Sequence, residues 1–217
     1  MEKILYIMFD YFLKTIIIGN SGVGKSTILL GKYQQIEPTI GIDLFTENVL
    51  WNNNTIKIHI WDASGNINYQ NIIRSYLSSC IGVFIVCNLN DSRSVESIEE
   101  WIRLYLDYRK SYCSIMIIGN IFKNEYSVNY QKIEEICKRY NAYYIELDVK
   151  KPGMSGVIYK KMAEIVLEDY KMNPGLFRNI EGFRDESKIK NNGNYSVEIG
   201  ESALIEDKHC CSACSIM

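Results

Sequence analysis

The stretch Gly19–Thr27, with the sequence GNSGVGKST, constrains the fold of this chain more than any other segment. An apolar, β-branched run over residues 12–18 precedes it, and the apolar residues 28–30 follow it. A strand, a glycine-rich loop and the start of a helix, in that order, form the setting of a phosphate-binding loop. An ordinary glycine-rich turn is the alternative interpretation, and the flanking strand and helix argue against it.

The residue types of this loop suit a polyphosphate ligand. Backbone N–H groups that are free at the start of a helix converge on an anion, and the helix dipole adds partial positive charge. Glycines let the backbone approach closely and turn sharply. Lys25 would supply a mobile positive charge for the outer phosphates, and Ser26 would offer its hydroxyl group to a magnesium ion.

Length and composition are those of a globular domain with an appendage. The chain has 217 residues, of which 47% are hydrophobic and 23% are charged. A net charge of −2 and a pI of about 5.8 give no basic footprint for nucleic acid, so we expect no nucleic-acid partner. Asp10 and Lys14 interrupt the apolar N-terminal run, no small-residue cleavage site follows it, and we expect neither a signal peptide nor a transmembrane helix.

Strand-like and helix-like segments alternate along the chain, which predicts a mostly parallel, six-stranded sheet with helices on both faces. In such three-layer α/β/α folds, ligands bind at the carboxyl ends of the strands. The expected strands cover residues 12–18, 42–50, 55–61, 81–87, 115–118 and 143–147, and the expected helices cover 25–32, 68–78, 92–108, 128–140 and 153–170.

The apolar periodicity ends near Met172, where polar residues such as Asn191–Asn194 and scattered charges take over. We therefore expect a folded domain over 10–171 and a flexible, disordered tail over 172–217. Four of the seven cysteines are scattered through apolar segments and are expected to be reduced core residues, without metal-ligand spacing. The other three lie near the end of the tail.

The chain resembles the Ras superfamily of small GTPases, and most closely its Rab branch, over about residues 10–171. The resemblance rests on Asp10–Lys14, the phosphate loop, Thr55–Asp62 and the pair Ser75-Tyr76. A tryptophan directly before Asp62 favours Rab over Ras proper. The resemblance implies the P-loop NTPase fold of a small G-domain. It also implies a GTPase that acts as a molecular switch in signalling or vesicle trafficking.

The resemblance assigns roles to individual residues. Amides of residues 21–26 and Lys25 would cradle the phosphates of GTP or GDP, and Ser26, Thr39 and Asp62 would hold Mg²⁺. Thr39 and Gly65 would close on the γ-phosphate and lose these contacts after hydrolysis, which is the switch. Lys25, Gly65 and Asn66 are the implied catalytic residues. The implied nucleotide-binding residues are Gly19, Ser21, Gly22, Val23, Gly24, Lys25, Ser26, Thr27, Thr39, Asp62, Gly65, Asn120, Lys123, Val149 and Lys150.

Two departures from the family pattern concern the hydrolytic step. Asn66 stands where the family has the glutamine that orients the attacking water, so the amide is kept on a side chain one methylene shorter. We therefore expect slow intrinsic hydrolysis. Ser64 replaces an alanine and adds a hydroxyl group beside the expected magnesium site.

Two further departures concern the base. The family's Asn-Lys-x-Asp motif reads Asn120-Ile121-Phe122-Lys123 here, and a lysine cannot accept the hydrogen bonds that the aspartate accepts from guanine. Guanine selectivity should weaken, with Asp148 and Glu125 as two candidates to supply the acceptor. The segment from Lys25 to Thr39 is short, so the aromatic that packs on guanine is either missing or replaced by Tyr33.

The last four residues, Cys214-Ser-Ile-Met217, fit a prenylation box of the farnesyl type. One lipid chain anchors weakly, and the tail after Met172 carries five basic against seven acidic residues. Cys210 and Cys211 are therefore the expected second signal, through palmitoylation, or are themselves prenylated. The implied location is the cytoplasmic face of a cellular membrane with a cytosolic pool. Implied partners are exchange and activating factors, effectors and a prenyl-binding escort.

Two other functions remain open from the sequence. A pseudo-GTPase scaffold would keep the fold and the lipid anchor without the switching cycle, and Asn66 and Lys123 support it. An ATP-using P-loop enzyme, such as a nucleotide kinase, is allowed by the missing guanine acceptor. Thr39, the segment Asp62–Gly65 and the prenylation box argue against that enzyme.

Overall fold

The computed structural model describes residues 9–31, 37–109, 112–123, 128–151, 153–178 and 180–187, which all belong to one compact unit ending at Ser187. Within these residues, no helix is both long and apolar enough to span a membrane. The strands are β1 (Tyr11–Ile18), β2 (Ile42–Trp51), β3 (Asn54–Ala63), β4 (Gly82–Asn88), β5 (Ser114–Ile121), β6 (Tyr143–Asp148) and β7 (Phe183–Asp185). The helices are α1 (Lys25–Leu30), α2 (Gln70–Leu77), α3 (Ser92–Glu96), α4 (Ile98–Tyr108), α5 (Tyr130–Tyr140) and α6 (Met154–Met172), with short 3-10 helices η1 (Ile67–Tyr69) and η2 (Pro174–Phe177).

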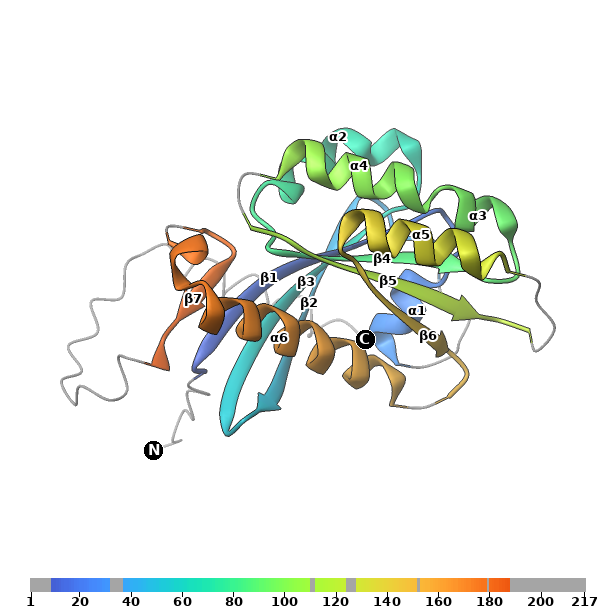
Figure 1. The fold of residues 1–217 in the computed structure, drawn as a ribbon. Helices are drawn as coiled ribbons and strands as arrows, with labels where there is room; N and C mark the ends of the chain where they lie inside the picture. Colours follow the sequence, from blue (N-terminus) through green and yellow to red (C-terminus); the bar gives the residue numbers. More distant parts are fainter. Residues whose placement is uncertain are drawn as a thin grey trace, which may run out of the picture. The chain divides into compact units, whose positions relative to one another are not determined.

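One sheet organises these elements in the order β2-β3-β1-β4-β5-β6, and β7 pairs with β1 (Figure 1). The pairs β3–β1, β1–β4, β4–β5 and β5–β6 are parallel, whereas β2 and β3 form an antiparallel hairpin. Asn52 and Asn53 make the hairpin turn with positive φ angles of 47° and 63°, a backbone region that asparagine tolerates better than most residues. The strands expected over residues 42–50 and 55–61 are confirmed, and together they form this hairpin.

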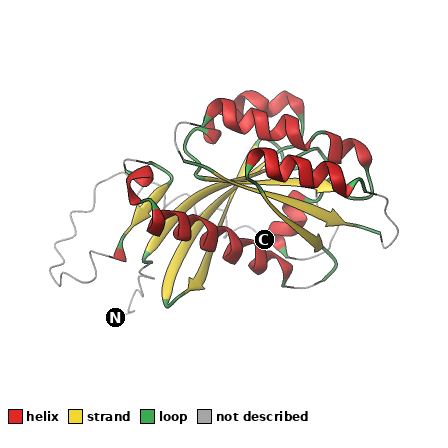
Figure 2. Cartoon of the chain, viewed as in Figure 1, coloured by secondary structure: helices red, strands yellow, loops and turns green. Residues whose placement is uncertain are grey.

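Helices cover both faces of the sheet (Figure 2). On one face, α1 and α6 pack on β1 residues such as Leu13 and Ile17. On the other face, α2 to α5 pack on Ile16 and Ile18. Successive side chains of a strand point to opposite faces, so the apolar run of β1 serves both cores. The three-layer, mostly parallel α/β architecture expected from the sequence is confirmed.

The helix expected over 92–108 is divided into α3 and α4 at Ser97. The Ser97 hydroxyl donates to the carbonyl of Arg93 at 2.8 Å, which closes the last turn of α3. Asp91 caps the start of α3 by accepting a hydrogen bond from the Arg93 amide. Position 97 thereby lies near the phosphate loop, where it has a second contact described below.

The sheet has a seventh strand, and this corrects the expected count of six. Strand β4 pairs with β1 only from Thr15 to Ile18, so the first half of that edge of β1 is left for another strand. Strand β7 takes it, antiparallel, with Leu13 opposite Phe183. The Lys14 amide donates to the Gly182 carbonyl at 2.8 Å, and the Glu186 amide donates to the Asp10 carbonyl at 2.7 Å.

Aromatic side chains hold β7 in place. Phe177 and Phe183 are almost fully buried, and their ring centroids lie 4.9 Å apart. Tyr170 lies 4.7 Å from Phe183 and donates a hydrogen bond from its hydroxyl to Asp185 at 2.7 Å. The expected tail began at residue 172, whereas folded elements continue through β7. A three-residue strand is too short for any periodicity to reveal it.

Removal of the Phe183 ring is expected to lower the free energy of unfolding by roughly 3 kcal/mol, because Phe183→Ala leaves a cavity between β1 and α6. Urea denaturation followed by circular dichroism measures the change. Leu176→Ala is the matched control, since that side chain is 56% exposed and should cost at most about 0.5 kcal/mol. Equal stabilities of the two variants would show that β7 contributes nothing to the folded unit.

Candidate functional site

The phosphate loop leaves β1 at the carboxyl end of the sheet and runs directly into α1. Gly19, Gly22 and Gly24 have positive φ angles of 144°, 77° and 90°. A Cβ atom on Gly19 would lie 2.3 Å from the Val86 carbonyl oxygen of β4, so only glycine fits where the loop leaves the strand. Ser21 and Gly22 are exposed at the tip of the loop.

Lys25 is buried in the loop rather than extended into water. Its Nζ donates to the carbonyl oxygens of Gly19 and Asn20, each at 2.9 Å. Burial lowers the pKa of the ammonium group to about 8, and the neighbouring Asp62 carboxylate opposes that shift. Two neutral carbonyls are weak partners for a buried cation, so the amine has more to gain from an anionic ligand.

The three residues assigned to magnesium lie together although they come from three segments. Ser26 Oγ donates to Asp62 Oδ2 at 2.5 Å, and Thr39 Oγ1 donates to the same oxygen at 3.1 Å. The two hydroxyl oxygens are 2.9 Å apart. Burial raises the pKa of Asp62, and the hydrogen bond from Ser26 is the largest opposing cause.

This group of oxygens fits a small, hard cation. Magnesium prefers carboxylate and hydroxyl oxygens, and here one carboxylate and two hydroxyl groups meet beside the phosphate loop. The second carboxylate oxygen, Asp62 Oδ1, is buried and has no hydrogen-bond partner among the described residues. A buried acceptor without a donor is costly, and a bound cation would relieve that cost.

The two segments expected to respond to the γ-phosphate both reach the phosphate loop. Thr39 does so through Ser26, as described above. A Cβ atom on Gly65 would lie 2.3 Å from the Ser21 amide nitrogen, so the second segment rests directly on the loop backbone. The Ser64 amide also donates to the Gly41 carbonyl at 2.9 Å, which links the two segments to each other.

Asn66, the residue implied to orient the attacking water, is engaged in a local turn. Its Oδ1 accepts a hydrogen bond from the Asn68 amide at 3.0 Å, an arrangement that asparagine favours at the start of helical segments. Its own amide donates to Ser64 Oγ at 3.3 Å, so the added hydroxyl group also takes part. Asn66 is exposed to solvent, but its carboxamide oxygen is hydrogen-bonded to the backbone.

The expected base-binding residues lie at the carboxyl ends of β5 and β6, where Ile121 pairs with Asp148. Asn120 is fully buried, and its Nδ2 donates to the Val23 carbonyl at 2.8 Å. Asn90 fixes the following turn, because its Oδ1 accepts from the amides of Phe122 and Lys123 at 3.0 and 3.1 Å. Sequence patterns alone gave no hint of this role for Asn90.

Of the two candidate acceptors for guanine, Asp148 lies within the described residues and Glu125 lies outside them. Asp148 lies at the end of β6, and its Oδ1 accepts a hydrogen bond from the Lys150 amide at 3.0 Å, which shapes the turn that carries Val149 and Lys150. Glu125 lies outside the described residues, as do Tyr33 and the tail cysteines Cys210, Cys211 and Cys214.

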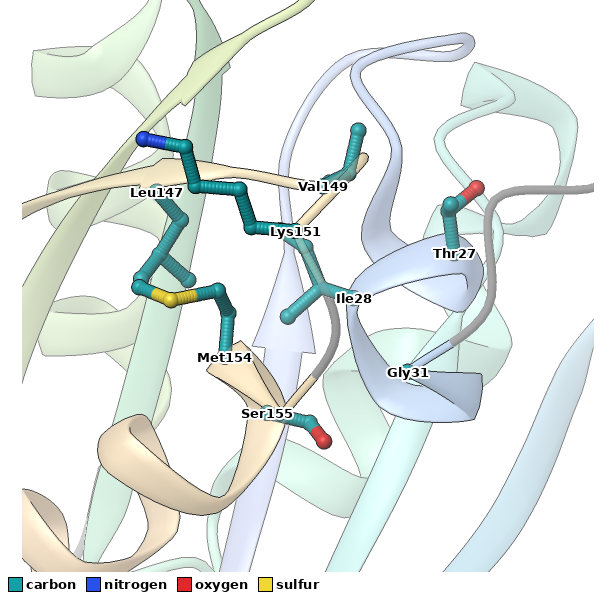
Figure 3. Close-up of a pocket in the computed structure, with 8 residues that line it drawn as sticks. All are labelled: Thr27, Ile28, Gly31, Leu147, Val149, Lys151, Met154 and Ser155. Carbon is teal, nitrogen blue, oxygen red and sulfur yellow. The ribbon is translucent and has the colours of Figure 1, made fainter.

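A small pocket lies beneath the base-binding turn, between α1 and the start of α6 (Figure 3). Ile28, Leu147 and Met154 turn toward one another in it, and the aliphatic stem of Lys151 extends alongside. The lining is mainly apolar, so the pocket supports the turn rather than reading a polar group. It is lined by Thr27, Ile28, Gly31, Leu147, Val149, Lys151, Met154 and Ser155.

Trp101 contacts the phosphate loop, which the sequence did not predict. Its place on the apolar side of its helix indicates a core residue, and it is 9% exposed. Its indole N–H also donates to Asn20 Oδ1 at 2.7 Å, and Asn20 Nδ2 donates to Ser97 Oγ at 3.1 Å. The division between α3 and α4 thus places two side chains that hold the loop.

A half-buried apolar patch lies between the two segments that touch the loop. Leu44 is opposite Trp61 in the β2–β3 register, and the rings of Trp61 and Tyr76 have centroids 4.6 Å apart. Ile40, next to this patch in sequence, is 81% exposed. Any rearrangement of the two segments would change the surface that this patch offers.

Comparison with known proteins bears on these assignments. Residues 14–168 match the model of the Ras family. The chain is 36% identical over 120 residues to "Ras-related protein Rab-11B" of Dictyostelium discoideum, covering 52% of this chain and 54% of that protein. It is 30% identical over 170 residues to "Ras-related protein YPTC6" of Chlamydomonas reinhardtii, covering 75% and 77%. It is 27% identical over 169 residues to "Ras-related protein SEC4" of Candida albicans, covering 75% and 80%. The match thus spans about half of Rab-11B and more than three quarters of the other two.

Proposed function

The chain belongs to the Ras family of small GTPases, in its Rab branch, and on that premise we propose that it is a membrane-anchored nucleotide switch. It binds GTP or GDP with Mg²⁺ and hydrolyses GTP slowly to GDP. The observation that carries this proposal is the convergence of Ser26, Thr39 and Asp62 beside the buried amine of Lys25. At the mouth of the glycine-rich loop, Lys25 supplies a positively charged ammonium group, and the other three residues supply oxygen atoms for the proposed Mg²⁺ ion.

Each residue of the site has a part in holding the nucleotide. Lys25 exchanges its two backbone carbonyls for phosphate oxygens, which accept stronger, charge-assisted hydrogen bonds. Ser26, Thr39 and Asp62 would hold Mg²⁺, which when bound neutralises phosphate charge. Gly65 brings its amide beside the loop without a side chain in the way.

Loss of the terminal phosphate would free the two segments together. Thr39 keeps its place through oxygen contacts at the cation site, and Gly65 rests on the loop at Ser21. The hydrogen bond from Ser64 to Gly41 couples the two segments, so the release of one favours the release of the other. The apolar patch of Leu44, Trp61 and Tyr76 lies between them and is the proposed contact for effectors. Exchange and activating factors would act on the same segments.

Nucleotide that co-purifies with the protein tests the proposal. GDP or GTP is expected in the perchloric acid extract by mass spectrometry, and a chelator of Mg²⁺ should speed its release. Lys25→Ala should weaken binding by about 10- to 100-fold, because charged hydrogen bonds are worth about 1.5–3 kcal/mol. Lys160→Ala, at an exposed lysine of α6, is the control. A protein that binds no guanine nucleotide with Mg²⁺ would rule the switch out.

Slow hydrolysis is proposed because the Asn66 carboxamide is held by the Asn68 amide. A water-orienting amide must be free to reach the nucleotide, and a shorter side chain in a turn is poorly suited to that task.

Asn66→Gln is expected to raise the single-turnover rate of GTP hydrolysis about 10-fold or more, because the longer amide leaves the turn and reaches the water. Asn71→Gln on α2 makes the same chemical change at an exposed site and should leave the rate unaltered. If Asn66→Gln hydrolyses GTP no faster than the unmodified protein, the proposed role of the turn is refuted.

A pseudo-GTPase scaffold is the second candidate, and one observation favours it. Asn120 is fully buried, so the base-reading amide is not accessible as the structure stands. The scaffold would keep the Rab-like fold and bind partners without a nucleotide cycle. The extraction experiment separates the two functions, since an empty protein supports the scaffold and bound GDP supports the switch.

Membrane attachment is proposed through Cys214, with Cys210 or Cys211 as a second lipid site and a prenyl-binding escort for the cytosolic pool. Mass spectrometry of the C-terminal peptide from cells should show a prenyl mass on Cys214, and Cys214→Ser should move the protein from the membrane fraction to the cytosol. Cys113→Ser is the control for loss of a thiol. An unmodified Cys214 would end this part of the proposal.

A further inference from the structure

The side chain of Asn20, the second residue of the phosphate loop, is held at both ends. Its Oδ1 accepts a hydrogen bond from the indole N–H of Trp101 at 2.7 Å, and its Nδ2 donates to Ser97 Oγ at 3.1 Å. An indole N–H can only donate, so this contact fixes which end of the amide faces Trp101. The loop is therefore tied to the junction between α3 and α4, far along the chain.

The partners of Asn20 are themselves held in place. Trp101 is almost fully buried and belongs to the core between the sheet and helices α2 to α5. The Ser97 hydroxyl uses its own proton on the Arg93 carbonyl at 2.8 Å, which leaves its oxygen to accept from Asn20. Because both partners are fixed by packing or by the end of α3, they can fix the loop in turn.

The backbone of Asn20 lies where several parts of the site meet. Its carbonyl oxygen accepts a hydrogen bond from Lys25 Nζ at 2.9 Å. A Cβ atom placed on Gly65 would lie 2.7 Å from that oxygen and 2.3 Å from the Ser21 amide nitrogen. The carbonyl and the amide belong to one planar peptide unit, so the orientation of Asn20 also sets the direction of the Ser21 N–H. That N–H is one of the amides assigned to the phosphates.

We propose that Trp101 is a positioning residue of the phosphate loop. Through the Asn20 side chain it holds the peptide unit between Asn20 and Ser21 in its phosphate-binding orientation, so that bound nucleotide is released slowly. A loop that is ordered in advance binds more tightly, because no binding free energy is lost in ordering it. The inference rests on the proposed function, since an effect on release requires a loop that binds nucleotide.

Trp101→Phe removes the N–H donor and keeps an aromatic ring in the core. With Mg²⁺ present, the variant should release GDP about 3- to 10-fold faster, which is the effect of one net hydrogen bond acting on the dissociation rate. Displacement of a fluorescent GDP analogue by excess GDP measures this rate in the full-length protein. A release rate equal to that of the unmodified protein would overturn the inference.

Tyr105→Phe is the matched control on the same helix. The Tyr105 hydroxyl donates to the Cys80 carbonyl at 3.0 Å, so this variant also loses one buried hydrogen bond of α4. Cys80 precedes β4, at the end of the sheet opposite the phosphate loop, and GDP release should remain unchanged. Equal acceleration in both variants would assign the effect to a general loosening of α4 and would overturn the inference.

Asn20→Ala tests whether Trp101 acts through Asn20. It should speed GDP release at least as much as Trp101→Phe, and the two substitutions together should release GDP no faster than Asn20→Ala alone. Effects that add in full would show that the indole acts by another route and would overturn the inference. Asn20 is only partly buried, so this variant keeps the core intact even if Trp101→Phe does not fold. Unchanged release in Asn20→Ala alone would also overturn the inference.

Hydrogen–deuterium exchange in the nucleotide-free, full-length protein separates this inference from the proposed function. The peptide covering residues 19–27 should exchange faster in Trp101→Phe than in the unmodified protein, whereas Tyr105→Phe should match the unmodified protein. Unchanged exchange in Trp101→Phe would overturn the inference. A protein that shows the expected exchange but binds no guanine nucleotide would overturn the proposed function and leave the role of Trp101 in ordering the loop.

Discussion

Pairing along both edges of β1 is the constraint on which the site depends. Strand β3 runs along one edge, while β4 and β7 divide the other. The strand therefore cannot shift in register, and the backbone that leaves it at Gly19 is fixed against Val86 of β4. A phosphate loop works only if its amides are in place before the ligand arrives, because ordering them on binding would cost affinity.

The fixed loop makes it possible to bury charge. Lys25 and Asp62 are each almost fully buried. Burial lowers the pKa of Lys25 and raises the pKa of Asp62, so in both residues it favours the neutral form. Their mutual attraction and the hydroxyl groups of Ser26 and Thr39 offset this cost. A polyphosphate would pair with the Lys25 ammonium group, and a cation would pair with the Asp62 carboxylate.

The sequence predicted the features that have a periodic pattern of apolar residues or a glycine-rich motif. The alternating strands and the loop at Gly19–Thr27 could be predicted from local pattern, and the grouping of Ser26, Thr39 and Asp62 could be predicted from family resemblance. Contacts between distant side chains were not readable. Asn90 beneath the base turn and Phe183 in β7 have no local signature, since only the folded sheet brings them to their partners. The same holds for the turn that engages Asn66.

The indole of Trp101 has an optical consequence. Its N–H donates to Asn20 within the phosphate loop, and a second indole, that of Trp61, packs against Tyr76 in a tilted arrangement beside the segments that touch the loop. Indole emission responds to hydrogen bonding and to the polarity around the ring. A ligand that alters the contact between Trp101 and Asn20 should therefore change the indole emission, so that ligand exchange could be followed in real time without an attached dye.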